Sequence, residues 1–111
     1  MTKAKFVYLN QLFHSFEISG HAEYADEGLD IVCAGISATV ITSLNLILKL
    51  INKKAKFSEN QEEGYMKLEI IDSNIESNVR NFLELTIDNM IESLEQISDV
   101  YPSHLKVKIE K

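Results

Sequence analysis

The chain has 111 residues, of which 45% are hydrophobic, and its formal net charge at pH 7 is −6. A chain of this length can build one domain with its own hydrophobic core but not two, so we expect a single domain over residues 1–111. The acidic charge argues against direct nucleic-acid binding, because neutralising phosphates requires clustered Lys and Arg. An acidic surface favours a basic partner instead.

The number of cysteines and the N-terminal residues indicate the cellular compartment. Cys33 is the only cysteine, so an internal disulfide is impossible and nothing indicates an oxidising environment. Residues 1–10 lack the apolar stretch and the small-residue cleavage site of a signal peptide. We therefore expect a cytoplasmic protein.

Residues 31–48 carry no formal charge, and their number reaches the length at which a membrane helix is considered. Polar side chains interrupt this stretch at Ser37, Thr39, Thr42, Ser43 and Asn45. We therefore predict a buried helix that is covered on several sides, and no membrane span.

Side-chain patterns predict two β-hairpins and a final strand. Residues 5–9 are rich in β-formers, and residues 12–19 follow them after a polar turn. Residues 54–57 and 65–71 alternate apolar with polar side chains on either side of a second polar turn. The same alternation in residues 104–111 predicts the final strand.

A long helix is predicted for residues 30–51, which are apolar around most of the helix circumference. Such a helix must be enclosed by a sheet and by a further element. Asp30 is a suitable N-cap residue. Gly35 lies inside this helix and costs about 1 kcal/mol relative to Ala. It indicates either a close backbone approach, room for a ligand, or simply a tolerated glycine.

A second helix is predicted from residue 73 or 74 to about residue 98, where apolar side chains recur at spacings of three and four. Pro102 prevents its continuation past Tyr101. Its start can be capped by one of three short polar side chains, Asp72, Ser73 or Asn74. The order ββ-α-ββ-α-β predicts an α+β fold, an α/β sandwich in which a mostly antiparallel sheet carries two main helices.

Cys33 and His21 are the candidates for catalysis. Cys33 falls in the first turn of the helix predicted for residues 30–51, where the helix dipole and free N–H groups stabilise a thiolate and can hold an oxyanion. His21 ends a predicted strand and should face the helix that follows. Its ring can act as the base if the acidic loop between the two residues folds back.

A third group usually orients the imidazole in such a site. Asp30 is the nearest acidic candidate, and Ser37, one turn beyond Cys33, is a polar candidate. Each residue also has a purely structural explanation. Cys33 can be a small core residue, His21 a surface residue, Asp30 only an N-cap, and Ser37 a side chain that bonds back to the helix backbone.

Metal binding by His21 and Cys33 would require two further ligands. The remaining histidines, His14 and His104, show no ligand spacing. We therefore expect no metal and no other cofactor.

A known family shares this stretch. The segment Gly20-His21-Ala22, a short acidic loop, the segment GLDIVCA over residues 28–34, and then Ser37 closely resemble the signature of the ribosomal-processing cysteine protease family, Prp. The likeness covers essentially the full length, because members of that family are also small, acidic and ordered as hairpin, helix, hairpin and helix.

The resemblance implies a cysteine endopeptidase that removes the N-terminal extension of a large-subunit ribosomal protein. Cys33 would be its nucleophile and His21 its base, with Asp30 and Ser37 in supporting roles. It also implies a homodimer, which would cover apolar faces of the central helix.

The substrate-binding residues expected for such an enzyme are Gly20, Tyr24 and Gly28. The loop that bears Tyr24 and the first turn of the helix would supply apolar subsites. Two other functions stay open: a non-catalytic ribosome-associated binding protein, and a thiol hydrolase that acts on a smaller acyl substrate.

Overall fold

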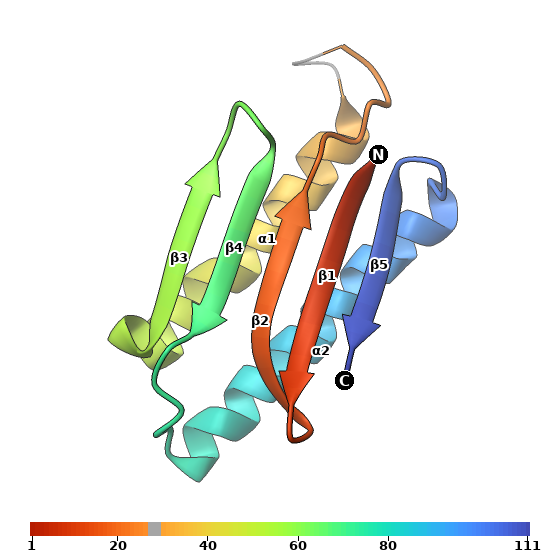
Figure 1. Ribbon diagram of the computed structural model, residues 1–111. Coiled ribbons are helices and arrows are strands. Elements are labelled where there is room, and N and C mark those ends of the chain that lie inside the picture. Colours follow the sequence, from red (N-terminus) through yellow and green to blue (C-terminus); the bar gives the residue numbers. More distant parts are fainter. Residues whose placement is uncertain (27–29) are drawn as a thin grey trace.

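The structure, a computed structural model, describes residues 1–26 and 30–111 (Figure 1). Its strands are β1 (Thr2–Leu9), β2 (Leu12–Ser19), β3 (Ala55–Asn60), β4 (Tyr65–Ile70) and β5 (Leu105–Glu110). Its helices are α1 (Ile31–Ile51), the short 3-10 helix η1 (Asn52–Lys54) and α2 (Ser77–Val100). Apart from η1, this is the predicted order of elements.

The strands form a sheet in the order β3-β4-β2-β1-β5. Neighbouring strands are antiparallel, except that β1 and β5 run parallel. Phe6 of β1 lies opposite Phe16 of β2, and Phe16 lies opposite Leu68 of β4. Residues paired across strands point to the same face, and these three side chains are fully buried. They therefore form the centre of the core.

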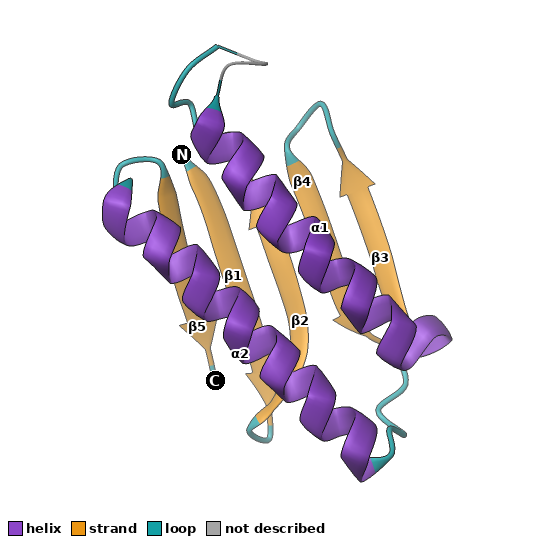
Figure 2. Ribbon diagram, turned by 180° about the vertical axis from the view of Figure 1, so that it is seen from behind, coloured by secondary structure: helices purple, strands orange, loops and turns teal. Residues whose placement is uncertain are grey.

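Both helices cover the same face of the sheet, and the opposite face is left open (Figures 1 and 2). Alternation along β1 explains the two faces, because Ala4 and Phe6 are buried whereas Lys3 is exposed and Lys5 partly exposed. The predicted α+β fold, an α/β sandwich of a mostly antiparallel sheet and two main helices, is confirmed.

α1 begins where it was predicted to begin, because Asp30 is its N-cap. It buries Val32, Ile36, Val40, Ser43, Leu44, Ile47 and Ile51. Together with η1, over Ile31–Lys54, it is long and apolar enough to cross a membrane, with a mean hydropathy of 2.1 over an 18-residue window. The core helix of a small sandwich has the same character, since it is covered by a sheet on one side and by a helix on another.

α2 begins later than predicted. Its N-cap is Glu76, which makes no side-chain capping bond, so the prediction that Asp72, Ser73 or Asn74 caps this helix is wrong. Asp72 instead accepts a hydrogen bond from the backbone N–H of Asn74 at 2.9 Å. Asp side chains commonly close such local turns, and this turn delays the helix.

Gly35 faces α2 across the contact between the helices. A Cβ atom added to Gly35 would lie 3.9 Å from Ile97 Cδ1, which is an ordinary van der Waals distance. The approach of the helices therefore does not require a glycine, and the explanation of a tolerated glycine is favoured.

Candidate active site

Cys33 lies in the first turn of α1, as predicted. Its thiol is free and half-buried, and it packs against the hydrophobic core. Ser37, one turn further along, is also half-buried, so the two side chains share one helix face. The hydroxyls of Thr39 and Ser43 bond back to helix carbonyls. The Ser37 hydroxyl makes no such bond among the described residues.

Asp30 ties the preceding loop to the first turn of α1. Its Oδ1 accepts from the backbone N–H of Cys33 at 2.8 Å, and its Oδ2 accepts from the N–H of Tyr24 at 3.0 Å and of Ala25 at 3.5 Å. Desolvation acts to raise the pKa of Asp30, but the backbone N–H donors, that of Cys33 first, outweigh it and lower the pKa below its ordinary value. Asp30 is therefore held as a carboxylate between the loop and the helix.

Tyr24 fastens the same loop to the segment between α2 and β5. Its ring packs edge-on against Tyr101, with ring centroids 5.3 Å apart, and against His104, at 5.4 Å. The Nδ1 atom of His104 lies 2.8 Å from the carbonyl oxygen of Ala22 and donates to it, because a carbonyl oxygen only accepts. Tyr24 remains 44% exposed, which leaves an aromatic surface beside the first turn of α1.

Gly20 has a structural role where β2 meets the N-terminus. Its φ is +85°, and an added Cβ atom would lie only 2.5 Å from the carbonyl oxygen of Met1. Thr2 Oγ1 donates to the Gly20 carbonyl oxygen at 3.3 Å. A glycine is therefore required here by the backbone itself. Gly28, the other glycine expected to bind substrate, lies outside the described residues.

His21 contacts the turn between β3 and β4. Its Nε2 atom lies 3.3 Å from the carbonyl oxygen of Glu62. A Cβ atom added to Gly64 would lie 2.8 Å from His21 Cε1, so the ring sits directly against Gly64. The sequence predicted that His21 faces the following helix, but it did not predict these contacts with the β3–β4 turn. Among the hydrogen bonds of residues 1–26 and 30–111, none joins the His21 ring to Cys33.

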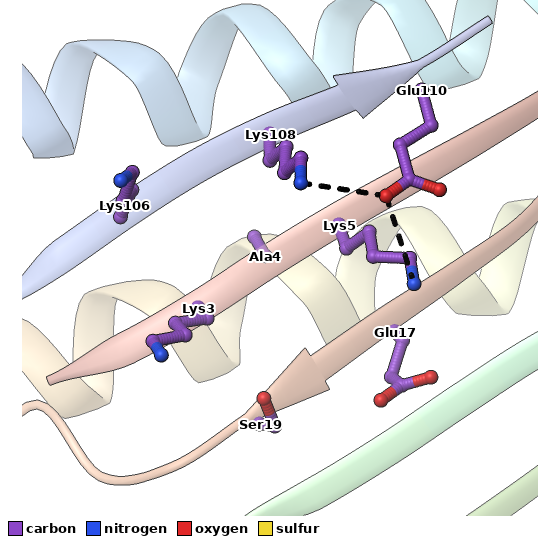
Figure 3. Close-up of a pocket in the computed structure, with 8 residues that line it drawn as sticks. All are labelled: Lys3, Ala4, Lys5, Glu17, Ser19, Lys106, Lys108 and Glu110. Atoms are coloured by element: carbon purple, nitrogen blue, oxygen red, sulfur yellow. Dashed lines mark ion pairs between the residues drawn. The ribbon is translucent and has the colours of Figure 1, made fainter.

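The open face of the sheet carries a separate hollow of about 330 Å³, lined by charged side chains of β1, β2 and β5 (Figure 3). The register places Lys3 opposite Lys106 and Lys5 opposite Lys108. Glu110 pairs with Lys108 at 3.6 Å and with Lys5 at 3.9 Å. This hollow is turned away from the layer that contains α1 (Figure 3), so we do not assign it to the candidate active site.

The described residues provide three groups for chemistry: the thiol of Cys33, the imidazole of His21 and the N-terminus of α1. No cluster of three or more His, Cys, Asp or Glu in the described part of the chain is arranged to hold a metal ion.

Known proteins are similar in sequence to this chain over most of its length. The family model of cysteine protease Prp matches residues 1–106. The ribosomal processing cysteine protease Prp of Bacillus subtilis (strain 168) is 36% identical over 93 residues, which are 84% of this chain and 82% of that protein. The protein of the same name from Staphylococcus aureus (strain Mu50 / ATCC 700699) is 28% identical over 90 residues, which are 81% and 80% of the two chains.

Solved structures share the fold. Prp from S. aureus in complex with a covalently linked product peptide has a TM-score of 0.84 and 23% identity, covering 99% of this chain and 100% of that one. The same protease with a substrate peptide has a TM-score of 0.80 and 22% identity, covering 99% and 100%. The family model spans nearly the whole chain, and the resemblance seen in the sequence is confirmed: the chain belongs to the cysteine protease Prp family.

Proposed function

We propose that the chain is a cysteine endopeptidase that removes the N-terminal extension of a large-subunit ribosomal protein, with Cys33 as nucleophile and His21 as base. The observation that carries the proposal is the position of Cys33. Its free, half-buried thiol stands in the first turn of α1, next to a loop that Asp30 ties to that turn. A thiol at a helix N-terminus, beside a loop that bears a histidine, has the groups that amide hydrolysis requires.

In the proposed reaction, the Cys33 thiol gives its proton to His21, and the sulfur attacks the carbonyl carbon of the scissile bond. The proton then passes to the departing amine as the C–N bond breaks, which leaves a thioester on Cys33. Water hydrolyses this thioester, which restores the thiol and releases a carboxylate. The N–H groups of Cys33 and Ala34 already donate to Asp30, and that of Val32 is also among its backbone donors. In this scheme the oxyanion is therefore stabilised by the N–H of Ile31 and the positive end of the α1 dipole.

Asp30 and Ser37 support the site in this proposal. Asp30 holds the loop and the first turn together through its bonds to the N–H groups of Tyr24 and Cys33. Ser37 presents a hydroxyl on the helix face of Cys33, where it can bond to substrate or to a water molecule.

Tyr24, Gly20 and Gly28 contribute to substrate binding in the same scheme. The exposed part of the Tyr24 ring, fixed by Tyr101 and His104, supplies an apolar wall for side chains that precede the scissile bond. The positive φ of Gly20 lets the chain turn out of β2 into the loop that bears Tyr24.

A ribosomal substrate is supported by the names of the relatives, which are ribosomal processing cysteine proteases. It is also supported by charge, because ribosomal proteins are basic and this chain has a net charge of −6. We place this reaction in the cytoplasm, whose reducing conditions suit a free catalytic thiol.

We further propose a homodimer in which the outer surfaces of the helical layers meet. In the monomer that layer exposes large apolar side chains, namely Ile31, Ile41 and Leu46 on α1 and Phe82 and Leu85 on α2. Exposed large apolar side chains gathered on one layer are typical of a protein interface, and two identical surfaces can pair about a twofold axis. Sedimentation should show a dimer at micromolar concentration, and Ile41→Glu with Leu46→Glu should give a folded monomer. A monomeric wild type would contradict this interface.

The proposed chemistry is tested with peptides of the extension junction and with His21→Ala. We expect His21→Ala to fold normally and to lose turnover, since no group replaces the base. A retained rate would remove His21 from that role. Dependence of the rate on residues flanking the scissile bond would distinguish a peptidase from a hydrolase of small acyl substrates.

A further inference from the structure

The hydrogen bond between His21 and the β3–β4 turn determines which ring nitrogen is free. The partner of Nε2 is the carbonyl oxygen of Glu62, at 3.3 Å. A carbonyl oxygen has no proton to give, so the bond exists only when Nε2 carries the hydrogen. In the neutral ring, Nδ1 is then unprotonated and able to accept a proton.

Asp30, the acidic candidate for orienting His21, is engaged elsewhere. Its two carboxylate oxygens accept from the backbone N–H groups of Cys33, Tyr24 and Ala25. Among the described residues, the hydrogen-bond partner of the imidazole is the Glu62 carbonyl.

We infer that the turn between β3 and β4 is the positioning element of the site: the Glu62 carbonyl and Gly64 hold His21 in the Nε2–H tautomer, with Nδ1 as the basic atom. This inference rests on the proposed function, since it assigns the third role that a cysteine–histidine site normally gives to a carboxylate or an amide. A backbone carbonyl is a known partner for the second nitrogen of a functional histidine.

The turn is built to hold that carbonyl in place. The Asn60 Oδ1 atom accepts from the N–H groups of Glu62, at 3.1 Å, and Glu63, at 3.3 Å. The Gly64 N–H donates to the Gln61 carbonyl at 3.2 Å. These bonds close a compact turn, and they do so without any help from the side chain of Glu62.

Gly64 lets the ring come close to the turn. Its φ is +62°, and an added Cβ atom would lie 2.8 Å from His21 Cε1 and 3.0 Å from the Gly20 carbonyl oxygen. A side chain at this position would therefore push the imidazole away from Glu62.

In this assignment Nδ1 is the atom that takes up and releases the proton. The Cys33 thiol proton moves to Nδ1 of His21, and the resulting imidazolium keeps its Nε2–H bond to the Glu62 carbonyl. The same proton leaves Nδ1 for the amine of the departing peptide. Nε2 never loses its hydrogen, so the turn holds the ring throughout the cycle.

The first test is the tautomer of His21 in the full-length protein, read from the ring nitrogens by nitrogen-15 NMR at a pH at which the ring is neutral. We expect wild type to show a protonated Nε2 and an unprotonated Nδ1. Asn60→Ala removes the acceptor that shapes the turn and should give a mixture of tautomers. Asn60→Asp keeps the Oδ1 acceptor and should resemble wild type, as should Ser58→Ala, an exposed site on the same hairpin.

The second readout is cleavage of a junction peptide by the same variants. Asn60→Ala should lower kcat by about tenfold or more, the size of effect seen when an outer partner of a functional imidazole is lost, with little change in KM. Gly64→Ala should do the same by displacing the ring.

The inference is overturned if wild-type His21 carries its hydrogen on Nδ1, or if Asn60→Ala and Gly64→Ala both leave the tautomer unchanged. Failure of wild type to cleave the peptide would instead contradict the proposed function, because the tautomer is measured without any substrate.

Discussion

The backbone N–H of Cys33 lies 2.8 Å from Asp30 Oδ1. The residue that starts α1 therefore also fixes the backbone of the only cysteine. The other carboxylate oxygen of Asp30 binds the N–H of Tyr24, so one side chain sets both the helix start and the fold of the loop before it.

Replacing Asp30 by Ala should therefore destabilise the protein. Loss of an N-cap of this kind costs about 1 kcal/mol, and the loop loses its anchor at the same time. Urea unfolding at neutral pH measures the difference from wild type. Asp30→Asn keeps one acceptor oxygen and should lose less stability than Asp30→Ala.

The contribution of Asp30 should also depend on pH. Its pKa in the folded protein is lowered from the ordinary 3.8, so its stabilising effect is complete above that value and is lost as the pH falls through the lower folded value. The stability gap between wild type and Asp30→Ala should therefore be constant at neutral pH and shrink in this acidic range. A gap that stays constant down to the acid transition would contradict the role of the carboxylate.

Substitution by alanine should have opposite effects on stability at Gly20 and at Gly35. Gly20→Ala places a Cβ atom 2.5 Å from the Met1 carbonyl oxygen at a φ of +85°, and a strained residue of this kind costs about 1–3 kcal/mol. Gly35→Ala adds an ordinary contact in a helix interior and should stabilise by up to about 1 kcal/mol. Thermal unfolding of both variants, compared with wild type, measures the two changes in stability. Stabilisation by Gly20→Ala would be incompatible with the described packing.

Tyr24 should hold the loop in place, and so support substrate binding, through its ring and not through its hydroxyl. Tyr24→Ala removes the edge-on contacts to Tyr101 and His104, each worth about 0.5–1.5 kcal/mol, and should raise KM for a peptide substrate. Tyr24→Phe keeps the ring and should behave as wild type. Equal KM values for all three proteins would remove Tyr24 from substrate binding.

The lysines of the open sheet face should repel one another. Lys5 and Lys108 share the carboxylate of Glu110, whereas Lys3 lies opposite Lys106. Like charges across neighbouring strands are destabilising by a few tenths of a kcal/mol to about 1 kcal/mol. Lys106→Glu should therefore raise the urea midpoint at low salt, and the gain should diminish as salt is added. Lys53→Glu, an exposed site outside the sheet, makes the same change in net charge and should show no such gain.

Local patterns predicted most of this fold. The Asp30 cap and the extent of α1 follow from residues adjacent in the chain, and the strand faces follow from alternation. The start of α2 was placed too early, because Asp72 uses its side chain to close a turn with Asn74 and not to cap the helix. Capping and turn formation use the same residue types, so the pattern alone did not separate them.

The surroundings of the candidate site were less predictable. Cys33, Asp30 and the loop lie together in the sequence, whereas His21 meets Glu62 across 41 positions and Tyr24 meets Tyr101 and His104 from the far end of the chain. These contacts depend on how the strands are ordered in the sheet. No spacing in one sequence encodes that order, although the glycine at Gly64 was a signal of a tight turn.

The central claim is that Cys33 is the nucleophile of a peptidase. Its most direct test is to incubate wild type and Cys33→Ala with a peptide that spans the N-terminal extension junction of the ribosomal protein from the same organism, and to identify the products by mass spectrometry. We expect cleavage at a single bond by wild type and none by Cys33→Ala. Equal cleavage by both proteins, or tight binding by both without cleavage, would contradict the claim, and the second result would favour a non-catalytic ribosome-associated binding protein.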